Sequence, residues 1–273
     1  MKPKIAIRNV SRFFDVKGGT FQALRNVNLE VGAEQFLCIV GPSGCGKSTL
    51  LRMLGGLEMA STGDISIAHD NPARPLTAMI FQQESVFPWL TVEKNAAYGL
   101  QVTNNWRGAE SAERVTYFLE KTGLLKFRDF YPYQLSGGMK QRLSVARAFV
   151  TNPEILLMDE PFAALDEQNK LLLQQELGKL WEEFRSTVVF ITHSLDEAVL
   201  LGDRVMVMSS APGHIKQAFD IPFARPRDFL ELRQQDDFHH LTRQMWELLR
   251  QEVEAARAQE AGRLSQERAR RNG

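Results

Sequence analysis

Cysteine, long apolar runs and net charge are all scarce in this chain of 273 residues. Its only cysteines are Cys38 and Cys45, too few for a disulfide framework or a set of thiolate metal ligands. No apolar run approaches the ~18–20 residues needed to span a bilayer, and the first residues lack the apolar core of a signal peptide. We therefore expect a soluble, cytoplasmic protein that reaches a membrane only through a partner.

The charges balance, with 33 lysines and arginines against 33 aspartates and glutamates. This balance argues against a nucleic-acid partner, which would favour a basic stripe. The apolar content of 44% and charged content of 24% are typical of a globular protein long enough for one large domain or two small ones. Because no internal repeat is visible, we expect a single copy of the folding unit.

Strand and helix patterns alternate along the first 220 residues. Apolar runs and alternations predict strands at residues 5–10, 24–31, 36–40, 64–67, 78–81, 155–158 and 187–191. Helical spacing predicts helices at residues 47–54, 139–149 and 168–184, and an inserted helical block over about residues 92–135. Continuously apolar strands that alternate with helices indicate a parallel α/β sheet.

The C-terminal segment differs in kind. Residues 221–227 form a proline-punctuated linker, and apolar residues then recur at helical spacing up to Val253. Beyond Glu254 there are almost no apolar anchors, which predicts a frayed or disordered end. We expect one domain over residues 1–220, followed by a linker and an amphipathic helix over residues 221–273.

A glycine-rich loop lies between a predicted buried strand and a predicted helix, and it fits the pattern G-x-x-x-x-G-K-[ST]. Its residues are Gly41, Pro42, Ser43, Gly44, Cys45, Gly46, Lys47, Ser48 and Thr49. The glycines let backbone N–H groups face the phosphates of a nucleotide, and the helix start adds positive potential. We expect Lys47 to neutralise phosphate oxygens, Ser48 to ligate Mg²⁺ and Thr49 to assist at the phosphates. The flanking strand and helix disfavour the alternative of a plain turn with a surface lysine.

Asp159 and Glu160 end an apolar strand, which puts two carboxylates at a sheet edge near this loop. Alone, an acidic pair after an apolar run is usually a solvated turn. Downstream of a phosphate loop it indicates hydrolysis. We expect Asp159 in the Mg²⁺ shell through water, and Glu160 as the general base that polarises the attacking water.

Residues 135–142 have the sequence Leu-Ser-Gly-Gly-Met-Lys-Gln-Arg and lie between the loop and the acidic pair. In that order these motifs resemble the ATP-binding cassette (ABC) ATPases, over about residues 4–220. The resemblance implies an α/β fold of the P-loop NTPase class, with a RecA-like parallel-sheet core, an antiparallel β subdomain and an inserted helical subdomain. It also implies that Ser136, Gly137 and Gly138 contact the γ-phosphate held by a second copy, so that ATP joins two cassettes head to tail.

The same resemblance singles out three polar residues. Gln82 resembles the Q-loop glutamine, which contacts Mg²⁺ and the attacking water, and His193 resembles the switch histidine, which touches the γ-phosphate. Asp166 resembles part of the D-loop, which lies across the dimer interface. Ala164 stands where the family usually has serine, and we expect little effect from the lost hydroxyl.

Aromatic residues add two further hypotheses. Phe14 resembles the aromatic residue that stacks on adenine, with Phe13 as a rival and burial in the core as an alternative. Phe87, Pro88 and Trp89 form an apolar cluster in a predicted loop, the region of transporter cassettes that receives a short helix from the membrane permease. The alternative is that Trp89 packs on the helical block as ordinary core, and both could hold.

Within the family, the sequence most resembles the importer cassettes for nitrate, aliphatic sulfonates and taurine. The resemblance rests on Phe81-Gln82-Gln83, Ser136-Gly137-Gly138-Met139, Ser210-Ala211-Pro212-Gly213 and Arg225-Pro226-Arg227-Asp228. It implies an ATPase that uses ATP and Mg²⁺, acts as a homodimer on the cytoplasmic face of the inner membrane, and works with a permease and indirectly with a solute-binding protein.

Two other functions remain open. An exporter or lipid-transport cassette would share every catalytic residue, and only the permease separates it from an importer. A soluble ABC ATPase acting on nucleic acid or ribosomes usually carries coiled-coil insertions or two cassettes in one chain. Neither is visible here, and the charge balance also argues against it.

Overall fold

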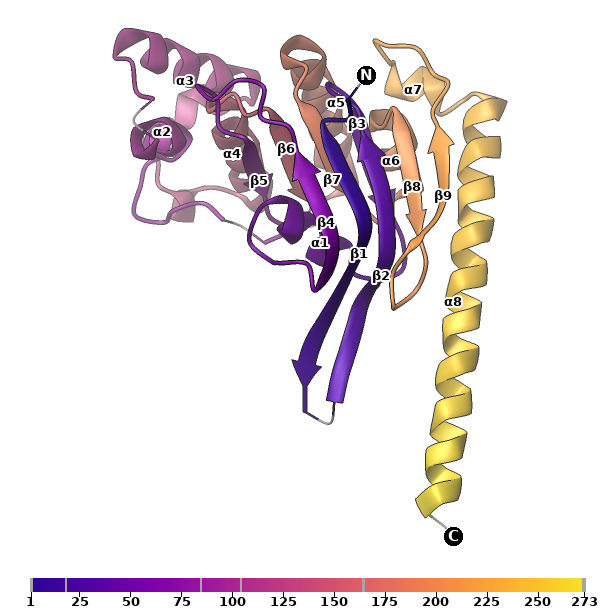
Figure 1. Ribbon diagram of the computed structural model, residues 1–273. Helices are drawn as coiled ribbons and strands as arrows, with labels where there is room; N and C mark the ends of the chain where they lie inside the picture. Colours follow the sequence, from indigo (N-terminus) through magenta and orange to yellow (C-terminus); the bar gives the residue numbers. More distant parts are fainter. Residues whose placement is uncertain (1, 18, 84, 104, 164, 272–273) are drawn as a thin grey trace.

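The computed structural model describes residues 2–17, 19–83, 85–103, 105–163 and 165–271, with side chains described up to residue 256. Ala164 lies outside the described residues. Within them the strands form two sheets (Figure 1): one has three strands in the order β2-β1-β4, and the other has six in the order β5-β6-β7-β3-β8-β9.

The six-stranded sheet is the centre of the fold. Its strands are β3 (Phe36–Val40), β5 (Thr77–Ile80), β6 (Ile155–Asp159), β7 (Thr187–Ile191), β8 (Arg204–Met208) and β9 (Ile215–Asp220). Neighbouring strands are parallel, except that β8 and β9 are antiparallel. The strands predicted at residues 36–40 and 187–191 have these bounds, and the strand predicted at 78–81 lies one residue earlier.

Both faces of this sheet are buried, each in its own apolar core. In β6, Ile155 and Leu157 lie in one core, whereas Leu156 and Met158 lie in the other. β3 and β7 alternate in the same way. Because successive side chains of a strand point to opposite faces, a strand buried on both faces must be apolar at every position. This requirement explains the continuous apolar runs in the sequence.

One face of the sheet is covered by α1 (Lys47–Leu54) and by the antiparallel sheet. The strands of that sheet are β1 (Ile5–Val16), β2 (Gly19–Val31) and β4 (Thr62–Ile67). β1 and β2 are longer than the strands predicted there, and their hairpin projects beyond the body of the molecule (Figure 1). The helix predicted at residues 47–54 has the bounds of α1.

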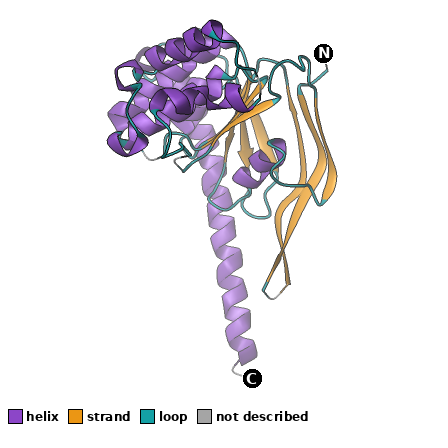
Figure 2. Ribbon diagram, turned by 90° about the vertical axis from the view of Figure 1, so that its left-hand side faces the viewer, coloured by secondary structure: helices purple, strands orange, loops and turns teal. Residues whose placement is uncertain are grey.

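Helices cover the other face, on the side away from the β1–β2 hairpin (Figure 2). α2 (Val92–Val102), α3 (Ala109–Lys121) and α4 (Gly137–Val150) pack together beside β5. α5 (Glu167–Phe184) and α6 (Leu195–Leu201) follow β6 and β7. Within the described residues, no helix is long and apolar enough to cross a bilayer.

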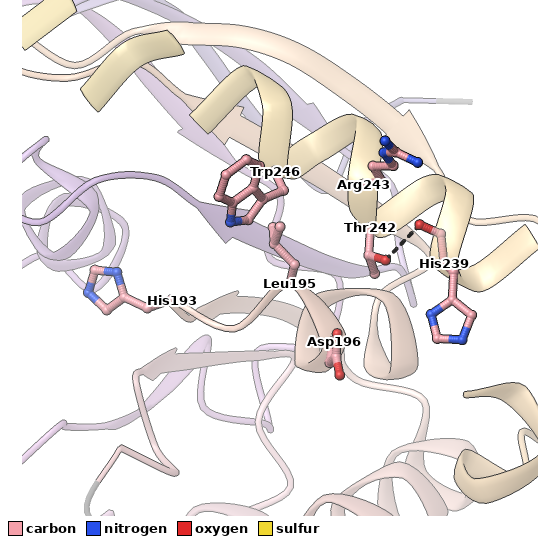
Figure 3. A pocket seen from close by; sticks show the side chains of 7 residues that line it. All are labelled: His193, Leu195, Asp196, His239, Thr242, Arg243 and Trp246. Atoms are coloured by element: carbon pink, nitrogen blue, oxygen red, sulfur yellow. Dashed lines mark hydrogen bonds between the residues drawn. The ribbon is translucent and has the colours of Figure 1, made fainter. Parts of the chain in front are cut away.

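The C-terminal segment packs on the rest of the chain through α7 (Phe229–Leu232) and α8 (Asp236–Arg271). Phe238 and Met245 of α8 are buried in the same core as the helices above. Between α6 and α8 lies a cavity of 390 Å³, with Leu195 on one side and Trp246 on the other (Figure 3). The amphipathic pattern of this helix therefore marks the face that packs against α6 and β8.

α8 continues to Arg271, beyond Glu254, where the sequence predicts fraying or disorder. The residues of this part are mostly alanine, glutamate, glutamine and arginine. These residue types have high intrinsic helix propensity, which accounts for a helix in a segment with almost no apolar anchors.

Two arginines attach the linker before α7 to the body. The Arg227 guanidinium donates hydrogen bonds to the carbonyls of Val199, Leu200 and Gly202, at 3.1, 3.0 and 2.8 Å. These carbonyls lie at the C-terminal end of α6, where a helix leaves them without partners. Burial lowers the pKa of Arg227 to about 10. Arg225 lies over the Trp181 ring, 4.1 Å from its centroid.

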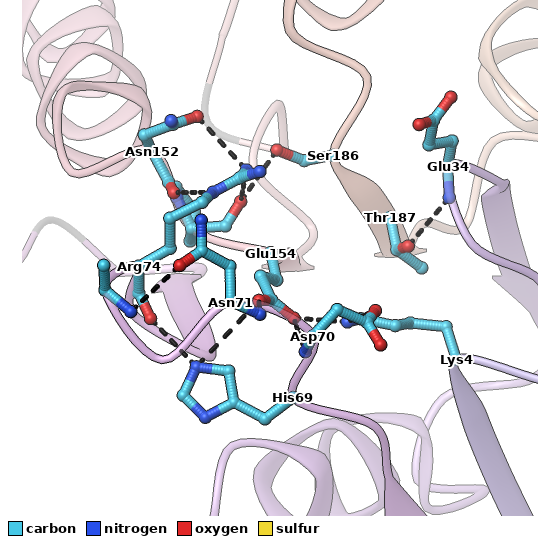
Figure 4. A network of polar contacts seen from close by, with 12 residues as sticks. Lys4, Glu34, His69, Asp70, Asn71, Arg74, Asn152, Glu154, Ser186 and Thr187 are labelled. Atoms are coloured by element: carbon cyan, nitrogen blue, oxygen red, sulfur yellow. Dashed lines mark hydrogen bonds and ion pairs between the residues drawn. The ribbon is translucent and has the colours of Figure 1, made fainter.

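A buried polar network joins the starts of β1, β5 and β6 (Figure 4). The Glu154 carboxylate accepts hydrogen bonds from the Lys4 ammonium and from the backbone N–H groups of Asp70 and Asn71. Burial alone would raise the pKa of Glu154, but these hydrogen bonds lower it to about 2. Lys4 and Glu154 are both buried, so both charges need compensation; Lys4 is paired with Glu154 and with the exposed Asp70.

This network predicts how stability depends on pH. The pKa of Glu154 is lowered from an ordinary 4.5 to about 2, so its contribution is complete above pH 4.5 and is lost as pH falls toward 2. In urea unfolding, Glu154→Gln should therefore lower the free energy of unfolding at pH 7 by about 3 kcal/mol, and the deficit should shrink toward pH 2. Asp70→Asn is the matched control, because Asp70 also pairs with Lys4 but is 70% exposed and should matter less. An unchanged deficit down to pH 2.5 would contradict this role.

Candidate functional site

The glycine-rich loop joins the end of β3 to the start of α1, and its backbone requires glycine at one position in particular. Gly46 caps α1 with φ 97°, a conformation that other residues rarely adopt. A Cβ atom there would lie 2.6 Å from Cδ2 of Leu24. The loop therefore keeps its shape only with glycine at position 46, and the N-terminus of α1 faces the space that it encloses.

Lys47 is buried within this loop. Its ammonium donates hydrogen bonds to the carbonyls of Gly41, at 2.8 Å, and Pro42, at 3.0 Å. The positive charge is therefore held inside the loop by neutral acceptors, with no carboxylate paired to it in the described residues. A cation in this position can be shared with phosphate oxygens.

A cavity of 370 Å³ runs along the loop. Phe14, Phe21 and Ala23 line it on β1 and β2, residues of the loop line it between Ser43 and Thr49, and Gln82, Glu160 and His193 complete it. Gln82, Glu160 and His193 follow β5, β6 and β7, whose carboxyl ends meet at the same edge of the sheet. The crevice at that edge is where α/β sheets of this kind bind ligands.

Ser48 lines the cavity, and Asp159 is hydrogen-bonded to Ser48. The Ser48 hydroxyl donates a hydrogen bond of 3.0 Å to Oδ1 of Asp159, whose side chain is buried. A hydroxyl and a carboxylate are the hard oxygen donors that Mg²⁺ prefers, and Mg²⁺ usually keeps several waters when it binds such a pair beside phosphates. The two side chains therefore fit the predicted Mg²⁺ site. The Gln82 amide N–H donates to Glu160, so the carbonyl oxygen of the same amide is the atom left for the predicted contact with Mg²⁺.

Glu160 is held between two of the other residues that the sequence singles out. Nε2 of Gln82 donates to its Oε2 at 3.0 Å, and Nε2 of His193 lies 2.6 Å from its Oε1. Its backbone N–H donates to the carbonyl of Ile191, and its φ is 46°, in the left-handed region. A non-glycine residue there is strained, and such strain is typical of functional sites. The sheet edge thus aims one carboxylate between an amide and an imidazole.

At the other end of the cavity, the structure distinguishes the two candidate aromatic residues. Phe14 lines the cavity, whereas Phe13 does not and is 37% exposed. The Arg12 guanidinium lies over the Phe14 ring, 4.5 Å from its centroid. Neither ring belongs to the buried core.

Phe21 was missed by reasoning from the sequence. It lies opposite Phe14 in the β1–β2 ladder and lines the same cavity. A tight hairpin between the two strands pairs residues 14 and 21 on one face, so the register of the hairpin is the signal that would have found Phe21. Without the hairpin register, Phe21 could not be distinguished from any other exposed residue of a strand.

Ser136, Gly137, Gly138 and Asp166 do not line this cavity. The Ser136 hydroxyl caps α4 by accepting a hydrogen bond from the N–H of Met139, at 3.3 Å. Asp166 caps α5, and hydrogen bonds from the backbone and side chain of Asn169 lower the pKa of its carboxyl. Ser136, Gly137 and Asp166 are exposed, as a role toward a second chain requires.

The loop after Gln82 is fixed from inside the helical block. The buried Asn95 amide accepts from the N–H of Phe87 and donates to the carbonyls of Phe87 and Leu90. The Phe87 ring packs on Tyr98, with a centroid distance of 4.4 Å. Trp89, in contrast, is 70% exposed, so it does not belong to the core of the helical block.

Comparison with known proteins identifies relatives of the whole arrangement. Residues 24–163 match the model of the family described as ABC transporter. The chain is 45% identical to an uncharacterized ABC transporter ATP-binding protein of Methanocaldococcus jannaschii, over 85% of this chain and 90% of that protein. It is 40% identical to the nitrate import ATP-binding protein NrtD of Synechocystis sp., over 80% of this chain and 82% of that protein. It is 38% identical to the aliphatic sulfonates import ATP-binding protein SsuB of Bacillus cereus, over 84% of this chain and 92% of that protein.

Among solved structures, the chain is similar to a dimeric ATP-binding cassette in a post-hydrolysis state, bound to ADP and Pi. The TM-score is 0.71 at 31% identity, over 81% of this chain and 100% of that one. The α/β cassette fold predicted from the sequence is therefore confirmed. The chain belongs to the ABC transporter family and is one of its ATP-hydrolysing, ATP-binding cassettes.

Proposed function

We propose that this chain is the ATP-hydrolysing subunit of an importer, in which two copies dock on an integral permease at the cytoplasmic face of the inner membrane. The ATPase part of the proposal is carried by the position of Glu160, held between Gln82 and His193 in the cavity beside the phosphate loop. This arrangement suits hydrolysis of a bound nucleotide, because the carboxylate is oriented beside the place where the terminal phosphate would lie.

Each residue of the cavity has a distinct task in this proposal. Loop N–H groups and Lys47 would bind the β- and γ-phosphates. Ser48 and Asp159 would hold Mg²⁺, and the ion would supply positive charge beside those phosphates. Glu160 accepts a proton from the attacking water, and Gln82 and His193 orient that carboxylate. His193 also donates toward the γ-phosphate.

Hydrolysis in this proposal requires a second copy of the chain. Ser136, Gly137 and Gly138 would complete the site of the partner, with the N-terminus of α4 directed at its γ-phosphate. Two facts support this: these residues lie outside their own cavity, and the similar solved cassette is dimeric. ATP would then hold the two cassettes together, and hydrolysis would release them.

The import of nitrate, aliphatic sulfonates or taurine-like solutes rests on likeness to other proteins. Relatives named as nitrate and aliphatic sulfonates import proteins match most of the chain, and the taurine class follows from the sequence resemblance alone. A separate binding protein would select the solute. The zero formal net charge disfavours a nucleic-acid or ribosome partner, whereas an exporter would differ only in its permease.

The exposed Trp89 supports the docking of a permease. Its loop is rigidly attached through Asn95, yet the indole is presented to the outside. Large apolar side chains that are exposed on an ordered loop are typical of the central residues of interfaces. We assign this loop to the permease.

The role of Glu160 can be tested with Glu160→Gln, which preserves the size of the side chain but removes the base. Turnover should fall by about 10²–10⁴-fold, while ATP binding is kept, because a positioned general base contributes about that factor. Single-turnover ATP hydrolysis and equilibrium binding of labelled ATP measure the two effects. Lys47→Ala is the contrasting variant and should lose binding itself. Turnover near that of the wild type in Glu160→Gln would disprove the assignment.

The role of Phe14 can be tested through the affinity for ATP. Phe14→Ala should weaken ATP binding by about 3–10-fold, because aromatic stacking is worth about 0.5–1.5 kcal/mol beyond area burial. Phe13→Ala is the matched control one residue away and should leave the affinity unchanged. Titration with a fluorescent ATP analogue and with its triphosphate-only counterpart separates loss of base stacking from loss of phosphate binding. Equal effects of the two substitutions would contradict the preference for Phe14.

The role of the loop that contains Phe87, Pro88 and Trp89 can be tested by capturing its membrane partner from detergent extracts of source membranes. With ATP and Mg²⁺ present, the Glu160→Gln protein should co-purify with a multi-span membrane protein. The double variant Glu160→Gln/Trp89→Ala should recover about tenfold less of that membrane protein, or even less, as for an interface hot spot. Trp106→Ala, at a tryptophan that is 42% exposed in the helical block, should keep the yield. Recovery of ribosomes or nucleic acid without a membrane protein would overturn the importer proposal.

A further inference from the structure

A buried carboxylate lies four residues after His193 in the sequence, and both of its oxygens have partners. Glu197, in the first turn of α6, accepts a hydrogen bond from the Thr192 hydroxyl and forms an ion pair with the Lys170 ammonium, 2.5 Å away. Its side chain is 5% exposed and that of Lys170 is 20% exposed. Together Lys170, Glu197 and Thr192 form what we call the α5–α6 brace.

The brace fixes both neighbours of His193. The Thr192 hydroxyl, held by Glu197, accepts a hydrogen bond of 3.0 Å from the N–H of Ser194. The Ser194 hydroxyl accepts in turn from the N–H of Glu197, at 3.3 Å. The backbone on either side of His193 is therefore tied to Glu197. The imidazole remains free to point at Glu160, 2.6 Å away.

The other end of the brace is anchored at the start of α5. The backbone N–H of Lys170 donates to the carbonyl of Asp166, the residue that caps this helix. Lys170 therefore connects the Asp166 segment directly to the first turn of α6. The contacts that join Asp166 to His193 thus pass through one ion pair and one hydroxyl.

The brace also forms part of the wall around the catalytic carboxylate. A cavity of 270 Å³ is lined by Glu160 together with Lys170 and Glu197. Breaking a buried pair leaves an uncompensated charge, which is strongly unfavourable. The brace therefore favours one relative position of α5 and α6, and with it one position of His193 against Glu160.

We propose that Lys170 and Glu197 are positioning residues for hydrolysis, which hold His193 against Glu160 and tie its position to the Asp166 segment. In this inference, which rests on the proposed cassette dimer, contact between a second copy and Asp166 is transmitted through the brace to the catalytic carboxylate. Neither residue lines the nucleotide cavity, so their effect should appear in turnover and not in binding.

The test compares Lys170→Met, Glu197→Gln and the double variant, which keep side-chain size but remove one or both charges. The turnover number of ATP hydrolysis should fall about tenfold in each, while the KM for ATP stays within about twofold. The double variant should be no worse than the worse single variant, because the two residues act as one unit. It also leaves no buried charge unpaired, so it should fold even if a single variant is unstable. Lys170→Arg should restore most of the turnover.

A matched control separates this role from plain stability. Lys216 and Glu252 form a similar ion pair of 2.8 Å between β9 and α8, away from the nucleotide cavity. Glu252→Gln should lower the melting temperature without changing turnover. If the brace variants lose turnover only in proportion to melting temperature, or if their effects add, the brace has no positioning role.

One further measurement distinguishes failure of this inference from failure of the proposed function. Size-exclusion chromatography with ATP and Mg²⁺ should show a dimer for Glu160→Gln and for Glu160→Gln combined with Lys170→Met. Absence of the dimer in Glu160→Gln would overturn the proposed cassette pair, and with it the coupling to Asp166. A dimer in both proteins, together with normal turnover in Lys170→Met alone, would overturn the brace and leave the proposed function standing.

Discussion

The burial of three parallel strands on both faces is the constraint on which the rest of the structure depends. Side chains of β3, β6 and β7 alternate between two apolar cores, so none of these strands can shift by one residue without exchanging its faces. Parallel strands then end at a common edge. The residues that follow them, including Lys47, Glu160 and His193, are brought to that edge by the packing of the cores and not by attraction to one another.

Local strain at this edge has a structural origin. Glu160 has a left-handed backbone because the chain must leave β6 while its N–H still pairs with Ile191 of β7. The cost is of the order of 1–3 kcal/mol, and the surrounding sheet offsets it. The consequence is a carboxylate aimed into the cavity between Gln82 and His193. A relaxed conformation would point the same side chain elsewhere.

The C-terminal segment helps to fix the position of α6. This short helix follows His193, and it is held at its start by Glu197 and at its end by Arg227. α8 packs against it, and the Phe238 side chain of α8 is buried in the same core as α6. A helix of two turns has little stability of its own, so these tertiary contacts determine where it lies. The position of His193 therefore depends in part on residues of the C-terminal segment, which do not line the nucleotide cavity.

Much of this protein could be predicted from the sequence because its signals are local. Continuous apolar runs, the spacing of the phosphate loop and the acidic pair after a strand each depend on a few neighbouring residues. They were sufficient for the strand bounds at residues 36–40 and 187–191, the helix over residues 47–54 and the grouping of Ser48 with Asp159. The family resemblance added Gln82 and His193, which no local pattern distinguishes from surface residues.

Only the tertiary structure decided the features that depend on register and on long-range packing. The place of Phe21 beside Phe14 depends on the hairpin register, and the exposure of Trp89 depends on which faces of the helical block meet. The brace joins Lys170 to Glu197 across two helices, a pairing that charge spacing in the sequence does not reveal. The sequence by itself determined which residues are apolar, acidic or free to turn, whereas their meeting in space followed from burying two cores at once.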